Sequence, residues 1–198
     1  MADVVQAGLG QAPEWVAAEM PPGYQTRLFE IQRLADELRS MDLIGRVLWE
    51  TGEPLREAVA ALLGTLECEV EAGAGPAGSI VVALSPSRRI LLVVSPASGP
   101  IQKTGGELAQ AFQAVQFASP GDRVVLVANT EPAKPPADRT DPVLPDALEM
   151  LQRMGVDVVA SATLFRLWRL SHEDRQKARR TLDLLHDQDG GTFAIAAR

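Results

Sequence analysis

Three short apolar runs constrain the fold of this chain more than any other feature of its sequence. Residues 89–94 read RILLVV, residues 123–128 read RVVLVA, and residues 156–160 read VDVVA. Segments with helical periodicity, residues 107–117 and 145–154, separate them. Strands with almost no polar face are typical of a sheet that helices cover on both sides. This order therefore predicts an α/β domain with a central sheet.

Further strands are predicted before and after these runs. Residues 66–72 alternate like a half-buried strand, and residues 79–84 form a second strand, so residues 66–94 resemble a run of hairpin-linked strands. Residues 192–197 are predicted to add an edge strand. We therefore expect a mixed central sheet flanked by helices, with an N-terminal helical extension.

Composition excludes several classes of protein. The chain has 198 residues, a hydrophobic fraction of 46% and a net charge of −7, all ordinary for a globular protein and unfavourable for general phosphate binding. No apolar run is long enough to span a membrane, and the first residues lack the basic region of an export signal. The single cysteine, Cys68, and the two histidines do not form a zinc motif. We expect a cytoplasmic protein without a cofactor.

The N-terminal part is predicted to be an arm followed by a long amphipathic helix. Residues 1–23 end in PPG and are predicted to be a flexible arm, in which only Trp15 is expected to bury its ring. Residues 24–50 carry apolar side chains at intervals of three and four. This stripe either packs on the chain's own domain or pairs with a second copy, and we expect packing plus a homodimer contact. Its members are Tyr24, Leu28, Ile31, Leu34, Leu38 and Met41.

The C-terminal part carries a local positive charge on an acidic chain. Residues 171–198 are predicted to form a basic helix, which begins at Ser171 with Asp174 completing a capping box, and then the edge strand. Between residues 165 and 180 the net charge is +4, which leaves −11 for the rest of the chain. Such a patch can contact an acidic protein surface or nucleic acid, and we favour protein. Its cations are Arg166, Arg169, Arg175, Lys177, Arg179 and Arg180.

Four segments carry a recognisable order of motifs: VLWETGEPLREAV at 47–59, LVAN at 126–129, GVDVV at 155–159 and LFRLW at 164–168. In this order they resemble the restriction-endonuclease-like superfamily, which is named after its PD-(D/E)XK motif, and in particular a bacterial lineage of it. The similarity covers roughly residues 47–170. The resemblance implies a nuclease-like α/β domain over residues 51–170.

The catalytic residues that the resemblance implies are not in this sequence. Active members of the superfamily bind a divalent cation through an Asp at the second strand and a Glu or Asp in the third strand, and a Lys two positions later orients the attacking water. Those positions fall on or next to Ser79, on Val93 and on Ser95. Valine cannot bind a metal ion, and a serine hydroxyl is a poor substitute for a carboxylate or an ammonium.

The alternative is that the protein is still a nuclease and that its active site has moved to other residues. Glu67, Glu69 and Glu71 alternate along one predicted strand and would share a face, although we expect that face to be an ordinary solvated one. Lys103 and Glu107 are expected to form a surface pair at the start of a helix.

The sequence therefore predicts a pseudo-enzyme. We expect a non-catalytic protein-interaction or regulatory module, self-associating, whose nuclease-like fold has lost its catalytic motif and its metal site. A non-catalytic nucleic-acid-binding protein and a metal-dependent nuclease with a relocated site are the two alternatives.

Overall fold

The structure of this protein, a computed structural model, describes residues 14–195. The chain divides into two compact units, Met1–Leu43 and Ile44–Arg198. Within the predicted arm, residues 1–13 lie outside the described part, and Glu14–Glu19 form a short helix, α1. Trp15 is 67% exposed, so the prediction that its ring is buried is wrong. Among the described residues, no helix is both long and apolar enough to cross a membrane.

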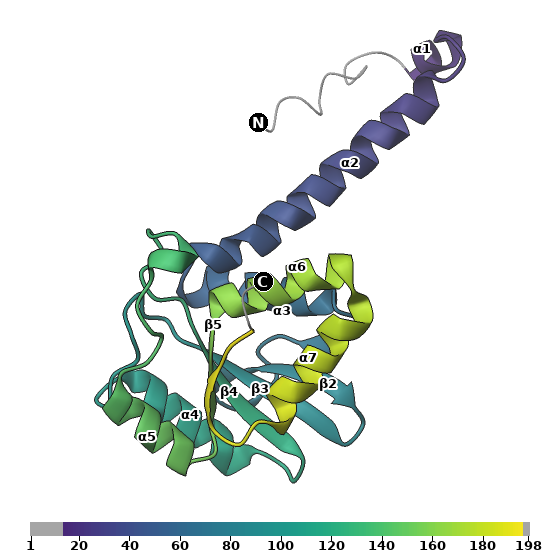
Figure 1. Ribbon diagram of the computed structural model, residues 1–198. Helices are drawn as coiled ribbons and strands as arrows, with labels where there is room; N and C mark the ends of the chain where they lie inside the picture. Colours follow the sequence, from purple (N-terminus) through teal and green to yellow (C-terminus); the bar gives the residue numbers. More distant parts are fainter. Residues whose placement is uncertain (1–13, 196–198) are drawn as a thin grey trace. The chain divides into compact units, whose positions relative to one another are not determined.

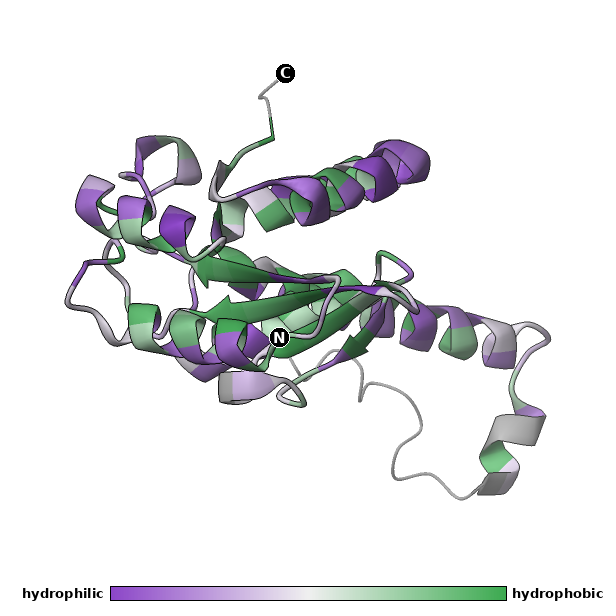
Figure 2. Cartoon of the chain, turned by 90° about the horizontal axis from the view of Figure 1, so that it is seen from below, coloured by the Kyte–Doolittle hydropathy of each residue, from purple (hydrophilic) through white to green (hydrophobic). Residues whose placement is uncertain are grey.

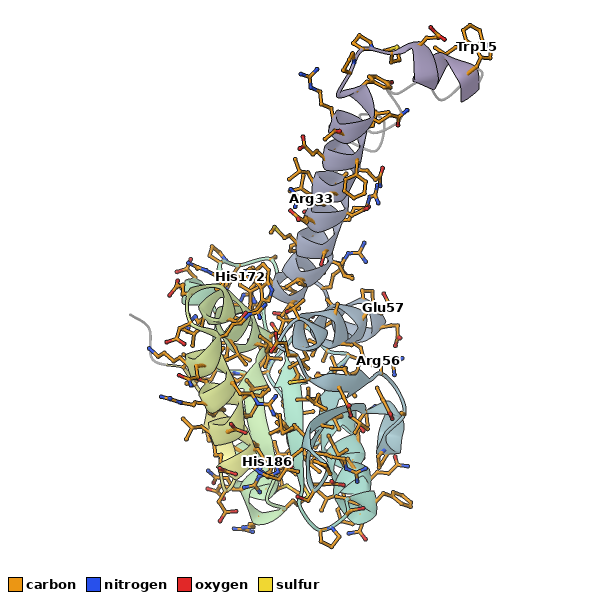
Figure 3. All side chains as sticks on the ribbon, turned by 90° about the vertical axis from the view of Figure 1, so that its right-hand side faces the viewer. Trp15, Arg33, Arg56, Glu57, His172 and His186 are labelled. Carbon is orange, nitrogen blue, oxygen red and sulfur yellow. The ribbon has the colours of Figure 1, made fainter. Side chains whose placement is uncertain are left out.

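The long helix of the N-terminal unit is α2, Tyr24–Gly45. Ion pairs along its solvent face join Arg33 to Glu37 and Arg39 to Asp36, at the spacings that bring helical side chains together. Figure 3 shows Arg33 projecting from this helix. A single turn of 3₁₀ helix, η2 (Arg46–Leu48), follows, so the regular helix ends earlier than the sequence pattern suggests.

The second unit is built on a mixed six-stranded sheet with the order β1-β2-β3-β4-β5-β6. The strands β1, β2 and β3 pair antiparallel, whereas β3 to β6 pair parallel. The predicted hairpin-linked strands and the predicted edge strand β6 are both present. The strands are β1 (Glu69–Glu71), β2 (Ile80–Ser85), β3 (Arg88–Val94), β4 (Asp122–Ala128), β5 (Asp157–Ala160) and β6 (Gly191–Phe193).

Helices cover both faces of the sheet (Figure 1). One apolar cluster joins the sheet to α3 (Gly52–Gly64), α6 (Ser161–Glu173) and α7 (Arg175–Asp187). A second cluster joins the other face to α4 (Gly106–Phe117) and α5 (Pro145–Arg153). Figure 2 shows the strands as almost uniformly hydrophobic and the helices as two-sided. The α/β fold with a mixed, helix-covered sheet is therefore as predicted.

The junction between α6 and α7 differs from the prediction. Ser171 lies inside α6, where its hydroxyl donates to the Trp168 carbonyl at 2.7 Å, so Ser171 does not begin a helix. The N-cap of α7 is Asp174, whose carboxylate accepts from the Lys177 backbone N–H at 2.9 Å. An aspartate is as good an N-cap as serine, so the helix begins about one turn later than the sequence pattern predicts.

Candidate functional site

The three positions that the resemblance assigns to catalysis lie on one face of the sheet. The β2–β3 register pairs Ile80 with Leu92, so Ser79, just before β2, lies opposite Val93. Ser95 is two residues beyond Val93, and side chains two residues apart along a strand point to the same side. This is the side that α4 covers, because Val93 packs in the cluster that contains Leu108 of α4.

Val93 is part of the apolar layer between the sheet and α4. Its side chain is 2% exposed and packs among aliphatic neighbours from β3, β4 and α4. A carboxylate or a metal ion at this point would lose its hydration without gaining oxygen ligands from the valine. Val93 therefore contributes to the packing of the apolar layer and not to a metal site.

Ser95 is buried beside a carboxylate that comes from α4. Its hydroxyl donates to Oε1 of Glu107 at 3.0 Å and accepts from the Ala97 backbone N–H at 3.2 Å. Glu107 is itself buried, and a Cβ on Gly105 would clash with its Oε2. The prediction that Glu107 forms a surface pair with Lys103 is wrong, because the first turn of α4 faces the sheet.

The hydroxyl of Ser79 is buried at the beginning of β2. Ser79 Oγ has no hydrogen-bond partner among the described residues. The backbone around it is tight, since the Gly75 N–H donates to the Ser79 carbonyl at 3.1 Å and a Cβ on Gly75 would clash with Ser79 Oγ. The three positions thus contribute two hydroxyls and one isopropyl group, with the Glu107 carboxylate next to them.

The glutamates proposed as a relocated site do not come together. Glu69 and Glu71 lie exposed on the edge strand β1, whereas Glu67 precedes that strand and pairs with Arg175 at 2.7 Å. Across residues 14–195 the structure contains no group of three or more acidic, histidine or cysteine side chains that could hold a metal ion. The shared face that the alternation implies therefore extends only to Glu69 and Glu71.

A buried polar network lies at the carboxyl end of β4. Asn129 donates to the Glu50 carbonyl at 2.7 Å and accepts from the Ser161 hydroxyl at 2.8 Å and from Arg139 at 2.7 Å. Arg139 also donates to the Leu48 carbonyl at 2.6 Å. Burial lowers the pKa of Arg139, although a guanidinium remains charged at neutral pH. This network joins η2, the end of β4 and α6, and its donors bind groups within the protein.

Paired charges lie at the opposite end of the parallel strands. Arg89 makes a two-pronged contact with Asp122 at 2.7 and 2.8 Å. Burial of Asp122 opposes its ionisation, but the hydrogen bonds from Arg89 and from the Ser119 N–H outweigh burial and lower its pKa. Nearby, His186, labelled on α7 in Figure 3, lies 3.0 Å from the Gly121 carbonyl. The contacts of Arg89 with Asp122 join β3 to β4, and the contact of His186 joins α7 to the turn before β4.

Asp157 is a buried carboxylate at this end, at the start of β5. It is 0% exposed and lies 3.2 Å from Nε of Arg123. Burial raises the pKa of Asp157 to about 6, and the attraction of Arg123 only partly opposes that shift. The acid is therefore held in a place that favours its neutral form.

This raised pKa predicts that the protein becomes less stable as the pH rises from about 4 to about 7. The folded state binds the proton more tightly than the unfolded state, so the stabilisation is complete below the unfolded pKa and is lost as pH passes the folded value. A shift of about two units corresponds to about 2–3 kcal/mol. Denaturant unfolding at pH 4 and pH 7.5 measures the change, and Asp157→Asn should remove most of it. An unchanged pH dependence in that variant would exclude Asp157 as the source.

The apolar stripe on α2 is exposed. Ile31, Leu34, Leu38 and Met41 are 47–62% exposed, whereas Tyr24 and Leu28 are half-buried. The first four follow the 3-4-3 spacing of a heptad repeat, with Ile31 and Leu38 at the a positions and Leu34 and Met41 at the d positions. The stripe thus has the composition of a coiled-coil seam.

The basic residues of α6 and α7 do not form a single free patch. Arg179 donates to the Leu84 carbonyl at 2.6 Å and lies 3.4 Å from the Cys68 sulfur, and Arg175 pairs with Glu67. Arg166, Arg169, Lys177 and Arg180 are exposed. Arg175 and Arg179 thus contact their own domain.

Comparison with known proteins identifies the fold. No protein-family model and no curated protein sequence matches this chain. Among solved structures, the restriction endonuclease FokI is similar with a TM-score of 0.53 and 12% sequence identity. The likeness covers 79% of this chain and 31% of the endonuclease chain, so this protein matches less than a third of the length of that enzyme. At this identity the likeness concerns the fold alone: the chain has a restriction-endonuclease-like α/β fold.

Proposed function

We propose that this protein is a non-catalytic protein-interaction or regulatory module, a degenerate relative of the PD-(D/E)XK nucleases that keeps their fold without their chemistry. The observation that carries the proposal is the packing of Val93. An aliphatic side chain fills the position where the resemblance expects a metal-binding carboxylate, between the sheet and α4.

The neighbouring positions support the same conclusion. Phosphodiester hydrolysis requires groups that neutralise the charge developing in the transition state, usually a bound cation and a lysine. Ser79 and Ser95 bring neutral hydroxyls, and the Ser95 hydroxyl already donates to Glu107. Glu107 is a single buried carboxylate, and its Oε1 already accepts a hydrogen bond from Ser95.

The interaction surface that we propose is the stripe on α2, and the first partner that we propose is a second copy of the chain. β-branched residues at a and leucine at d favour parallel two-stranded coiled coils; Ile31 and Leu34 fit that rule, whereas Leu38 at a and Met41 at d are apolar without fitting it. A partner protein can then bind to the nuclease-like unit.

Incubation of the purified chain with plasmid DNA and with RNA, in Mg²⁺ and then in Mn²⁺, tests the loss of catalysis. We expect no cleavage above a buffer control. Metal-dependent cleavage that disappears in the Glu107→Gln variant would show that a relocated site works and would end the proposal.

A further inference from the structure

A pocket in the second unit lies where the turn after α3 meets the beginning of α7. Its volume is about 360 Å³, toward the lower end of the range of about 300–1,000 Å³ that ligand pockets occupy. Leu66 and Ala178 provide apolar surface, and the remaining lining residues are polar. The lining residues are Thr65, Leu66, Glu67, Ser171, Arg175, Ala178 and Arg179.

The donors of this pocket are two arginines. The hydroxyls of Thr65 and Ser171 already donate to helix carbonyls at 2.6 and 2.7 Å, so they have no hydrogen left for a ligand. Arg179 uses both terminal nitrogens on Leu84 and Cys68. Within the described part of the chain, Arg175 uses only Nη1, on Glu67. An anion that takes the place of Glu67 can therefore bind Nη1 and Nη2 together, with Arg179 adding charge beside it.

Glu67 shows what kind of anion this pocket accepts. Its carboxylate lies 2.7 Å from Arg175, yet both side chains are more than 70% exposed, so water and solutes reach the pair. The backbone of Glu67 has φ of 59°, a left-handed conformation that is unfavourable for a residue with a Cβ. The Glu67 carboxylate thus binds Arg175 with a strained backbone and in a position that solvent reaches. A competing carboxylate can displace it there.

We propose that this pocket binds the carboxylate of an acidic side chain on a partner protein. The carboxylate pairs with Arg175 in place of Glu67, and an apolar neighbour in the partner segment packs on Leu66 and Ala178. Arginine suits this task because its planar group forms paired hydrogen bonds with a carboxylate. The inference rests on the proposed function, since it gives the non-catalytic module a site for its partner.

The balance of charge favours a carboxylate over a phosphate. Glu67 remains close to the site and repels a dianion more strongly than a monoanion, and among the described lining residues only Arg175 has both Nε and a terminal nitrogen without a partner. The apolar floor also fits a peptide side chain and offers nothing specific to a nucleotide. The pocket therefore matches an acidic peptide segment better than a nucleic-acid backbone.

Two peptides with blocked ends test this assignment on the whole chain. They differ only in whether one side chain ends in a carboxylate or in an amide. Acetyl-Gly-Leu-Glu-Gly-amide is titrated while the Nε–Hε signals of the arginines are followed by NMR, and the peptide with Gln in place of Glu is the matched control. We expect saturable shifts of the Arg175 and Arg179 signals with the Glu peptide only. Arg175→Gln should abolish the binding, Arg166→Gln should not change it, and Glu67→Gln should tighten it about two- to fivefold, the range of an exposed ion pair.

Two results would overturn the inference. If neither peptide gives saturable shifts, or if Arg175→Gln binds as well as the unchanged protein, the pocket is not a carboxylate site. If inorganic phosphate binds more tightly than the Glu peptide, the natural ligand carries a phosphate. Neither result bears on cleavage or on self-association, because those are measured at other parts of the chain.

Discussion

Replacing Val93 with glutamate is expected to destabilise the protein by about 4 kcal/mol at pH 7. The new carboxyl group would lie in the apolar layer between β3 and α4, where burial raises the pKa of an acid by roughly three units, each worth about 1.4 kcal/mol. Urea unfolding at pH 7 measures the loss of unfolding free energy. At pH 5 the loss should be smaller, because protonation removes the buried charge.

Leu184→Glu is the matched control for this change. Leu184 lies exposed on α7, so the same gain of charge should change stability by less than about 0.5 kcal/mol. Mg²⁺ should rescue neither variant. A Val93→Glu protein that is as stable as the unchanged chain and gains stability from Mg²⁺ would mean that the metal site of the nuclease fold is still open.

The second large effect is expected on self-association. Leu38→Asp should weaken dimerisation by about thirtyfold or more, since each subunit would bring an unpaired carboxylate into the seam at a cost of about 1–3 kcal/mol, and each 1.4 kcal/mol is tenfold in affinity. Sedimentation equilibrium over a range of protein concentrations measures the dissociation constant. The unchanged chain should also dimerise more tightly at high salt. In a parallel pair Glu37 would face Asp42 of the other copy, and salt screens this repulsion.

Phe29→Asp separates the seam from the rest of the helix. Phe29 is 71% exposed on α2 but lies at the f position, opposite the seam, so its replacement should leave the dissociation constant within about twofold. A chain that is monomeric at all concentrations would contradict the proposed self-association. Equal effects of Phe29→Asp and Leu38→Asp would contradict the proposed seam.

The fold could be predicted because its signals are local and repeated. The runs that became β3, β4 and β5 lack a polar face, and the helices between them have clear periodicity, so the layers follow from burial. The N-terminal helix was equally visible. The junction of α6 and α7 was misplaced because Ser171 and Asp174 are both good capping residues, and only the hydrogen bonds distinguish them.

The side-chain environment of the site was harder to predict. The helical pattern predicts that Glu107 lies on the surface. In the structure the first turn of α4 faces the sheet, and Glu107 contacts Ser95. Arg139 comes from a proline-rich loop, and nothing in its neighbourhood indicates that it reaches Asn129. Glu67 was assigned to a strand face, whereas its left-handed backbone turns it toward Arg175.

Calorimetric titration of the unchanged protein with Mn²⁺ tests the central claim most directly. Manganese prefers oxygen ligands, as magnesium does, so it reports on any carboxylate site of the nuclease type. The account predicts no saturable heat up to millimolar metal and no difference between the unchanged chain and Glu107→Gln. Binding of one ion per chain that Glu107→Gln abolishes would contradict the account, because a working metal site would then remain beside β3.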